Sequence, residues 1–317
     1  PSVDEGAYGG GIIFDLPGGQ NYPTSMGAFQ DSFSAGLIDV GISKFSADGR
    51  NLIYSTYLGG NSIDLPISTL EGIDKSLIIL GVTGSLNFPV TPNAYDTSFA
   101  VGPNQALRQG GLFAVPNGSH IFLTVLDSTG GNLLGSTYFG DTALDGKNQE
   151  LHFNFGDEFR GDLAQDVNGN IFFVSNTASP NLAQGSSVMQ STFGGGQDGF
   201  AGSFNSDLST LNWGTYVGGS SNDALFSLTV TDNNRLYVTG ATESTDFTPL
   251  VSNGYQSALA GKVDAIVAEL NPVNGALVNF TFSGTSENDL SYFADDNQNG
   301  DVIILGQTYG DWFISDT

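Results

Sequence analysis

A seven-residue motif built on a threonine and an aromatic residue recurs four times along the chain. The copies read YSTYLGG at residues 54–60, GSTYFGD at 135–141, WGTYVGG at 213–219 and NFTFSGT at 279–285. Self-similarity in a fixed order is the signature of a repeat architecture, in which each copy is one structural unit stacked on its neighbours. The repeat therefore constrains the fold more strongly than any local pattern.

Two predicted β-hairpins flank each copy of the motif. Short runs rich in β-branched and aromatic residues are typical of strands, and turns containing Asp-Gly or Asn-Gly join such runs into hairpins. The strands before the motif are residues 39–45, 120–126, 198–204 and 264–270, and the last strands after it are 77–81, 171–174, 236–240 and 302–306. Each unit is thus predicted to hold four short antiparallel strands. A radial arrangement of such four-stranded sheets is a β-propeller.

The order of these elements resembles the SBBP β-propeller repeat. The order comprises an Asp-led apolar strand, a turn, the Thr-aromatic motif, Asn-x-x-Asp, Leu-Tyr-Val-Thr-Gly, Asp-Phe and Gly-Tyr-Gln, and residues 213–256 match it best. The family occurs mainly in large secreted and surface proteins of bacteria. In gliding and related Bacteroidetes, such proteins often carry gliding-motility-associated or type IX sorting regions. The resemblance covers nearly the whole chain and implies a fold, but it brings no catalytic residues with it.

We expect residues 1–317 to form one all-β propeller domain, or part of one, with about three full blades and partial blades at both ends. The predicted segments are the end of a preceding blade (1–31), a blade with an insertion (32–117), a blade with an inserted loop at 142–160 (118–196), a blade (197–261) and an incomplete blade (262–317). An open arc would leave blade faces exposed. We therefore expect a larger protein or a ring closed by additional strands, with a compact ring of four to five blades as the alternative.

The composition narrows the possible partners. Thirty-three acidic residues against eight basic ones give a formal charge of −25, and such a surface repels nucleic acid and anionic lipid. Two explanations of the acidity stay open, namely solubility of an exported protein and binding of divalent cations. The chain has no cysteine, so thiol catalysis and cysteine-based zinc sites are excluded. No apolar run reaches the roughly 18 residues of a membrane span, and we expect Pro1 to be a mature or trimmed end because no signal peptide opens the chain.

The repeated positions are predicted to be structural. Each aromatic residue would fill the space between neighbouring blades, and each glycine would permit a close backbone approach. These positions are Thr56, Tyr57, Gly59, Thr137, Tyr138, Gly140, Thr215, Tyr216, Gly218, Thr281, Phe282 and Gly284. The aspartates that open strands, Asp39, Asp198 and Asp264, are expected to cap turns or hold backbone amides. His120 stands in the place of such an aspartate.

One segment resembles half of a calcium-binding loop. Asp295, Asn297 and Asn299 stand at alternate positions before a glycine, as oxygen ligands do in such loops. The ninth and twelfth positions are Ile303 and Gly306, which offer no ligand side chain. A hairpin turn fits the pattern better than a calcium site, and no other cofactor is expected.

The inserted loop and the end of the chain carry candidate partner-binding residues. Aromatic side chains are enriched at interface anchors, and insertions in repeat proteins map to loops on one face, which is often the binding face. The candidates are His152, Phe153, Phe155, Phe159 and Trp312. Packing of the same side chains back onto the fold is the alternative. The chain has only two histidines, which cannot form a convincing zinc site, and no Gly-x-Ser-x-Gly elbow, so no catalytic residue is assigned.

These features favour a non-enzymatic extracellular scaffold or adhesion module of a large bacterial surface protein. Its place would be in gliding-motility or surface-attachment machinery, and its partners would be other surface or envelope proteins or further domains of the same polypeptide. The alternative is a propeller that binds or cleaves polysaccharide, because glycosidases need only two suitably spaced carboxylates. Acidic residues are too plentiful here for such a pair to be read from the sequence.

Overall fold

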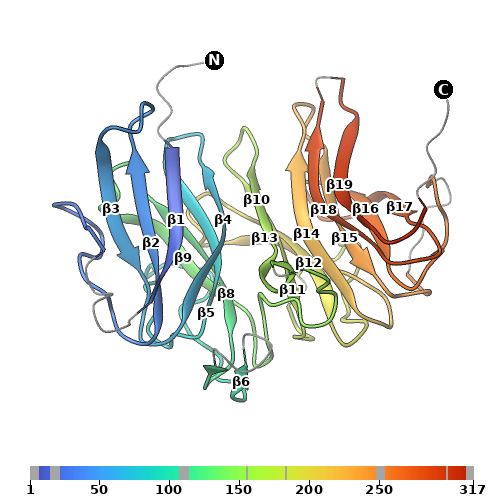
Figure 1. The fold of residues 1–317 in the computed structure, drawn as a ribbon, viewed down its shortest axis with the longest axis horizontal. Coiled ribbons are helices and arrows are strands. Elements are labelled where there is room, and N and C mark those ends of the chain that lie inside the picture. The colour runs from blue at the N-terminus through green and yellow to red at the C-terminus, as the bar shows by residue number, and fades with distance from the viewer. Residues whose placement is uncertain are drawn as a thin grey trace. The chain divides into compact units, whose positions relative to one another are not determined.

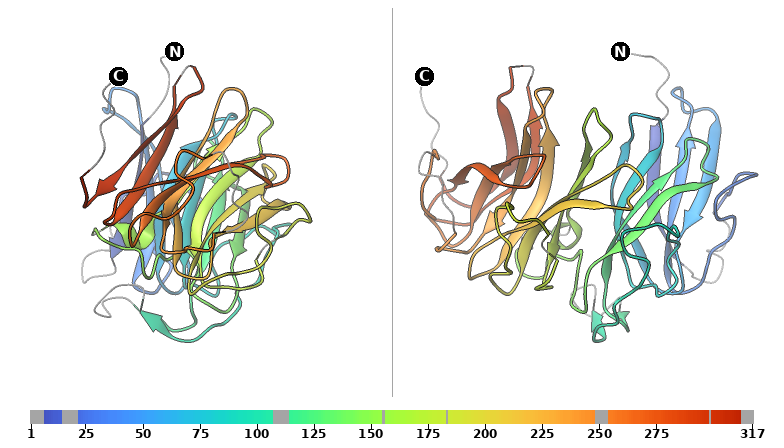
Figure 2. Two further views of the ribbon diagram at one scale, coloured as in Figure 1. Left: turned by 90° about the vertical axis from the view of Figure 1, so that its right-hand side faces the viewer. Right: turned by 180° about the vertical axis from the view of Figure 1, so that it is seen from behind.

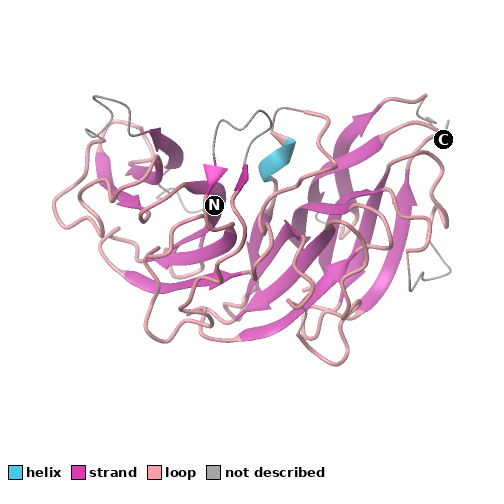
Figure 3. Ribbon diagram, turned by 90° about the horizontal axis from the view of Figure 1, so that it is seen from below, coloured by secondary structure: helices cyan, strands magenta, loops and turns pink. Residues whose placement is uncertain are grey.

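The computed structural model is an antiparallel all-β structure (Figure 1). It describes residues 7–14, 22–106, 114–154, 156–182, 184–247, 254–297 and 299–311. Within these ranges the only helical element is a single 3-10 turn at Asp157–Phe159, drawn in cyan in Figure 3. None of the described residues belongs to a helix long and apolar enough to cross a bilayer.

Three four-stranded sheets form the body of the chain, with a smaller sheet before and after them in the sequence. The strand orders are β1(Ala7–Phe14)-β2(Ile38–Phe45)-β3(Leu52–Leu58), β4(Asp64–Glu71)-β5(Leu77–Thr83)-β8(His120–Leu126)-β9(Leu133–Phe139), β10(Asp162–Gln165)-β11(Ile171–Thr177)-β12(Asp198–Phe204)-β13(Leu211–Val217), β14(Asp223–Val230)-β15(Leu236–Thr242)-β16(Asp264–Leu270)-β17(Leu277–Ser283) and β18(Asp289–Asp296)-β19(Val302–Thr308). A short pair, β6(Gln105–Ala106) and β7(Ala114–Val115), lies in the insertion of the second sheet. The structure is thus a β-rich repeat protein.

The hydrogen-bonded sheets are shifted by two strands from the segments predicted on the sequence. Each predicted segment after the first, such as 197–261, holds the last two strands of one sheet and the first two of the next. The reason is that the Thr-aromatic motif lies in the last strand of a sheet, as in β13, and the chain then leaves for the next sheet through Gly218 and Gly219. A boundary centred on the motif groups strands that follow one another in sequence but belong to different sheets.

The chain divides into two compact units, which we describe separately. The first unit, residues 1–144 with 206–210, holds the sheets β1-β2-β3 and β4-β5-β8-β9. These two sheets share one hydrophobic cluster, made by Val40, Ile42, Tyr54, Leu58, Leu77, Ile79, Phe88, Phe122, Leu126 and Tyr138. Burial of each such side chain contributes about 1.5–3 kcal/mol to folding, so this cluster holds the two sheets together.

The second unit, residues 145–205 with 211–317, contains the remaining large sheets. Its main cluster draws side chains from both four-stranded sheets, including Phe172, Trp213, Leu225, Ile266 and Phe282. The second strand of each four-stranded sheet in the molecule, β5, β11 and β15, is buried along its whole length. These strands are nearly continuous apolar runs because they lie in the middle of a sheet covered on both faces.

Tyr216 shows how the aromatic residue of the motif is used. Its side chain is fully buried, and its ring meets the ring of Phe200 edge to face at 5.4 Å. Its hydroxyl donates to the Ser179 carbonyl at 2.7 Å and accepts from the Leu182 amide at 2.8 Å. The ring fills the core while the hydroxyl fixes the segment that follows β11.

We predict that Tyr216→Ala lowers the free energy of unfolding by about 3–5 kcal/mol, because it opens a cavity and leaves two backbone groups without their partner. Denaturant titration measures the loss. The matched control is Tyr255→Ala, since Tyr255 is 88% exposed and its removal should cost no more than about 0.5 kcal/mol. Equal stability of the two variants would show that Tyr216 is not a core residue.

Candidate functional site

Three buried aspartates each bind the threonine that ends the neighbouring strand and the serine two residues later. Asp64 is an example, since its two carboxylate oxygens accept hydrogen bonds from the Thr83 hydroxyl at 2.5 Å and the Ser85 hydroxyl at 2.9 Å. The Gly60 amide adds a third bond at 2.7 Å. We call this group of one aspartate with its threonine and serine the clasp.

The same clasp recurs in the second unit. Asp223 binds the Thr242 hydroxyl, the Ser244 hydroxyl at 2.8 Å and the Gly219 amide at 2.6 Å. Asp145 binds the hydroxyls of Thr177 and Ser179. All three aspartates are completely buried. The sequence signal is the Thr-x-Ser that ends the second strand of each sheet, at 83–85, 177–179 and 242–244.

Burial sets the protonation behaviour of the clasps. Loss of solvation raises the pKa of Asp64 and of Asp223 to about 6, while the bonds from the threonine, the glycine amide and the serine oppose that rise. The hydrogen bonds therefore hold a charge inside the fold that would otherwise be expelled. A carboxylate whose two oxygens both accept hydrogen bonds in this way has a structural role, since it joins neighbouring strands.

The strand-opening aspartates bind backbone amides in the segment that joins their strand to the preceding strand of the same sheet. We call this segment the linker. Asp198 accepts from the Gly194 amide at 2.8 Å and the Gly195 amide at 3.2 Å, and Asp264 makes the same bonds with Ala260 and Gly261 at 2.8 and 3.0 Å. Asp39 accepts from the Ser34 amide at 2.7 Å. Burial raises the pKa of Asp198 to about 7, partly offset by these amides.

The glycines and threonines of the motif contact the same linker or the aspartate that binds it. A Cβ on Gly218 would lie 2.6 Å from the Asp198 carboxylate, and Gly59 and Gly284 face Asp39 and Asp264 in the same manner. Each threonine hydroxyl accepts a hydrogen bond from a linker amide at 2.8–2.9 Å. The pairs are Thr56 with Gln30, Thr137 with Asp96, Thr215 with Gln190 and Thr281 with Gln256. The motif thus recurs where linker, strand and aspartate meet.

His120 replaces the strand-opening aspartate in the second sheet and reverses the direction of the contact. Its Nε2 lies 3.1 Å from the Ala100 carbonyl, whereas the aspartates accept from amides. The ring stacks on Phe99 with a centroid distance of 4.1 Å. Desolvation lowers the pKa of His120, so the neutral imidazole is favoured and the residue joins the core.

The calcium candidate has the hydrogen bonds of a hairpin turn. Asn297 Oδ1 accepts from the amides of Asn299 and Asp301 at 2.9 and 3.0 Å, and Asp295 Oδ1 accepts from the next amide along the chain. Asp166 makes the same pair of bonds in the corresponding turn of β10 and β11. Within the described residues, no three His, Asp or Glu side chains are grouped to hold a metal ion. Calcium binding at Asp295, Asn297 and Asn299 remains a prediction.

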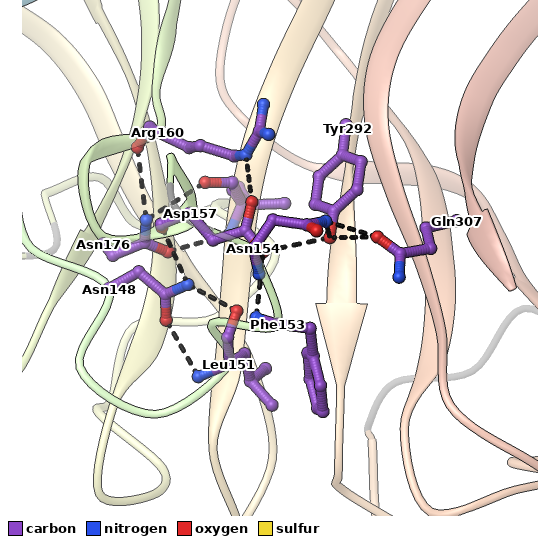
Figure 4. A network of polar contacts seen from close by, with 10 residues as sticks. Asn148, Leu151, Phe153, Asn154, Asp157, Arg160, Asn176, Tyr292 and Gln307 are labelled. Atoms are coloured by element: carbon purple, nitrogen blue, oxygen red, sulfur yellow. Dashed lines mark hydrogen bonds and ion pairs between the residues drawn. The ribbon is translucent and has the colours of Figure 1, made fainter. Parts of the chain in front are cut away.

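The inserted loop interrupts the first strand of its sheet. Asp145 bridges to Thr177, the chain then leaves, and it returns as β10, where Asp162 pairs with Val174. The fully buried Asp157 holds the loop down (Figure 4). Its Oδ2 accepts from the amides of Phe153 and Asn154 at 2.9 and 2.8 Å, and its Oδ1 receives Arg160 Nε at 2.8 Å.

Tyr292 of β18 ties the loop to the rest of the second unit. Its hydroxyl donates to Asp157 Oδ2 at 3.0 Å, and the Arg160 guanidinium lies 4.1 Å above its ring, a cation–π contact. The Asn154 amide group donates to the Tyr292 hydroxyl and to Gln307 of β19 (Figure 4). Burial, followed by the charge of Asp157, raises the pKa of Tyr292, so the phenol stays protonated as a donor.

The structure separates the partner-binding candidates. Phe153 is half-buried and packs against a cluster that includes Leu151, Phe226 and Tyr292. His152 and Phe159 are also half-buried, and Phe159 ends the 3-10 turn. Phe155 and Trp312 lie outside the described residues. Both predicted roles of the loop stay open, because the loop packs on the fold through Phe153 while His152 and Phe159 keep part of their surface in solvent.

A cleft of about 520 Å³ lies near the end of the second unit. Among its lining residues are the rings of Tyr255 and Tyr309 and the carboxylates of Glu287 and Asp311. Asn61 and Ser220 occupy the position of Ser286 in two preceding repeats. There the backbone amide donates to a side chain of the following linker, namely Asn87 and Asp246 respectively. The cleft therefore occupies a position that linker residues fill elsewhere in the molecule.

Comparisons with known proteins give a structural likeness and no family. No family model matches the chain, and no curated protein matches it. Chains of solved structures do match, and one is a crystal structure of a protein of unknown function from Dyadobacter fermentans. It is 15% identical, with 85% of this chain and 68% of that chain covered and a TM-score of 0.37. At that score the likeness carries no argument about fold or function.

The clasp predicts a pH dependence of stability. Because the pKa of folded Asp223 lies near 6, above its unfolded value of about 4, its ionised form destabilises the native state. That cost is fully present above about pH 6 and vanishes below about pH 4. Relative to Asp223→Asn, the wild-type protein should gain about 2–3 kcal/mol between pH 7 and pH 4, measured by urea titration.

Asp246→Asn is the control for that measurement. A hydrogen bond from the Ser220 amide lowers the pKa of Asp246, so its stabilising effect is present above its unfolded pKa and is lost as the pH falls further. The difference from wild type should therefore stay nearly constant between pH 7 and pH 4 and change in the opposite direction below about pH 4. A pH-independent difference for Asp223→Asn would contradict the assignment of its raised pKa.

The loop network predicts a local effect of Asp157. Asp157→Ala removes the acceptor of two amides, a guanidinium and a phenol, so it should lower the free energy of unfolding by about 3–5 kcal/mol. Amide exchange at Phe153 and Asn154 should accelerate by the largest factor in the protein, as measured by hydrogen–deuterium exchange. Glu150→Gln, an exposed change in the same loop, should leave both readings unaltered.

Proposed function

We propose that this chain is a non-enzymatic β-propeller module of the SBBP type, acting as a scaffold or adhesion element of a large bacterial surface protein. In this proposal the four-stranded sheets are blades. The module presents loops to other surface or envelope proteins, or to further domains of its own polypeptide. Gliding-motility or surface-attachment machinery is the setting that the sequence resemblance suggests.

The observation that carries the proposal is the use made of the buried carboxylates. Asp64, Asp145 and Asp223 each bind two hydroxyl groups, and Asp157 binds two amides, a guanidinium and a phenol. A general acid or base needs an oxygen free to exchange a proton with a substrate. These four groups instead act as fixed acceptors, which suits a rigid display module.

The inserted loop is the part of the second unit that we propose as the docking surface. Asp157 and Tyr292 fix its backbone, so a partner would meet a surface that is already ordered. Such preorganisation lowers the entropic cost of association. His152 and Phe159 keep part of their surface in solvent, and aromatic side chains of this kind are enriched among interface anchors.

Polysaccharide binding is the second candidate, and the 520 Å³ cleft favours it. Two tyrosine rings and two carboxylates lie around one hollow, and aromatic rings offer flat apolar surfaces next to polar groups. The competing explanation of the cleft is that it is the place where a linker side chain lies in other repeats, as Asn87 and Asp246 do.

The scaffold proposal predicts specific partners on intact cells. Affinity purification of the native full-length protein from producing cells, followed by mass spectrometry, should recover a stoichiometric set of envelope or surface proteins. Protease added to intact cells should digest the protein while a cytosolic marker survives. The double variant His152→Ala/Phe159→Ala should lose at least one of the recovered partners.

Tyr255→Ala is the matched control, because it removes a different, exposed aromatic residue. It should retain the full partner set. Recovery of the protein alone, with resistance to external protease, would contradict the scaffold proposal. Binding to purified polysaccharide that Tyr255→Ala abolishes would instead support the second candidate.

A further inference from the structure

β19, the last strand of the described residues, has the sequence of a buried strand but the exposure of an edge strand. β19 reads VIILGQT, and β5 at the same position of its sheet reads LIILGVT. Every residue of β5, β11 and β15 is buried, whereas no residue of β19 is. Ile303 and Leu305 are 55% and 65% exposed. A strand so apolar on both faces is suited to the middle of a sheet.

Among the described residues, no strand lies beside β19 in the place that β8, β12 and β16 take in the complete sheets. β5 pairs with β8, β11 with β12 and β15 with β16, all antiparallel. Among the described residues β19 pairs with β18 alone, and the two strands stand as a hairpin, drawn in red in Figure 2. One edge of β19 therefore presents unpaired amides and carbonyls, which is a template for another strand.

A cavity lies beside the glycine of β19 that corresponds to Gly81 of β5. Gly81 of β5 lies beneath the ring of Phe122 from β8, at 2.4 Å from the position of a Cβ. Gly81 also lies close to the backbone of β4, and Gly306 of β19 lies equally close to the backbone of β18. In both sheets, and in the sheet of β14, the first strand has a bulge at this point. Beside Gly306 lies a cavity of about 220 Å³.

The clasp is also incomplete at this sheet. Asp289 corresponds to Asp64 and Asp223, and it binds Thr285 through Oδ2. Its Oδ1 is buried and has no hydrogen-bond partner in the described structure. Thr308, which corresponds to the clasp threonines Thr83 and Thr242, donates to the Gly310 carbonyl instead. An unpaired buried oxygen is costly, so a rearrangement that returns Thr308 to Asp289 would be favourable.

We infer that the free edge of β19 binds an antiparallel strand–turn–strand hairpin of this same repeat class, supplied by a polypeptide segment other than residues 1–317. The register follows from the complete sheets, where Thr83 faces His120, Thr177 faces Asp198 and Thr242 faces Asp264. The bound strand opens with aspartate or histidine opposite Thr308. Its third residue is aromatic or branched aliphatic and fills the cavity beside Gly306, as Phe122 and Ile266 face Gly81 and Gly240.

Backbone pairing and apolar burial provide the affinity of this complex. Strand addition to a sheet edge uses main-chain hydrogen bonds for affinity and alternate side chains for specificity. The specific elements here are the residue opposite Thr308 and the residue above Gly306. This inference names one partner for the proposed scaffold and rests on its repeat architecture, not on its cellular location. Failure of the cell-surface experiment would leave it intact, and the reverse also holds.

The test uses a synthetic peptide with the sequence of residues 264–283, which contains β16 and β17. Added to the full chain, it should bind with 1:1 stoichiometry and slow amide exchange in β19 at least tenfold. The same peptide with Ile266→Asp places a charge in the cavity and should bind at least tenfold more weakly. A scrambled peptide should not bind.

Two protein variants locate the binding site on the protein. Ile303→Lys puts a charge on the exposed edge strand and should weaken peptide binding at least tenfold. Val273→Lys changes an exposed apolar residue in the turn between β16 and β17 and should have no effect. Both positions tolerate lysine in the free chain because their side chains already reach solvent.

A fusion provides a second measurement if the peptide aggregates. Residues 254–283 repeated after Thr317 should raise the melting temperature and protect β19, and Ile266→Asp in the added copy should abolish both effects. The inference is overturned if peptide and fusion leave β19 unprotected, or if the scrambled peptide binds equally. It is also overturned if β19 is already protected in the free chain, because its own residues or a second copy would then cover the edge.

Discussion

A buried carboxylate bound by two hydroxyl groups is the interaction on which each of the three four-stranded sheets depends. The first strand of a sheet brings the aspartate, and the end of the second strand brings Thr-x-Ser, as in Asp64 with Thr83 and Ser85. Without the hydroxyls an ionised aspartate at full burial would cost several kcal/mol. The hydrogen bonds make the same group a fixed point at which the linker, the turn and two strands are joined.

This use of charge explains how an acidic, cysteine-free chain forms a stable core. Part of the acidity serves the interior, where buried carboxylates bind hydroxyl groups, as Asp64 does, or linker amides, as Asp198 does. No disulfide is available, so the sheets rest on aromatic packing and on these polar fixed points. The inserted loop is held in the same way, since the buried Asp157 accepts hydrogen bonds from the amides of Phe153 and Asn154.

The sequence predicts much of the fold because the repeat is written in it four times. Strands, turns and the number of four-stranded sheets follow from the motif and its flanking hairpins. The sequence does not show where one sheet ends and the next begins. The motif lies in the last strand of a sheet, and its sequence does not reveal which strands are hydrogen-bonded to each other. The clasp could have been found from the recurring Thr-x-Ser. The contact between Asp157 and Tyr292 could not, because it joins a loop present once with a strand 135 residues away.

The most direct test of the account is a double-mutant cycle between Asp223 and Thr242. Unfolding free energies of the wild type, Asp223→Ala, Thr242→Val and the double variant give the coupling of the two side chains. If the clasp holds the repeat together, the coupling should be about 1–3 kcal/mol in favour of the folded state. A coupling near zero would show that the buried aspartate does not stabilise the fold through this bond, and its conserved geometry across the repeats would then need another function.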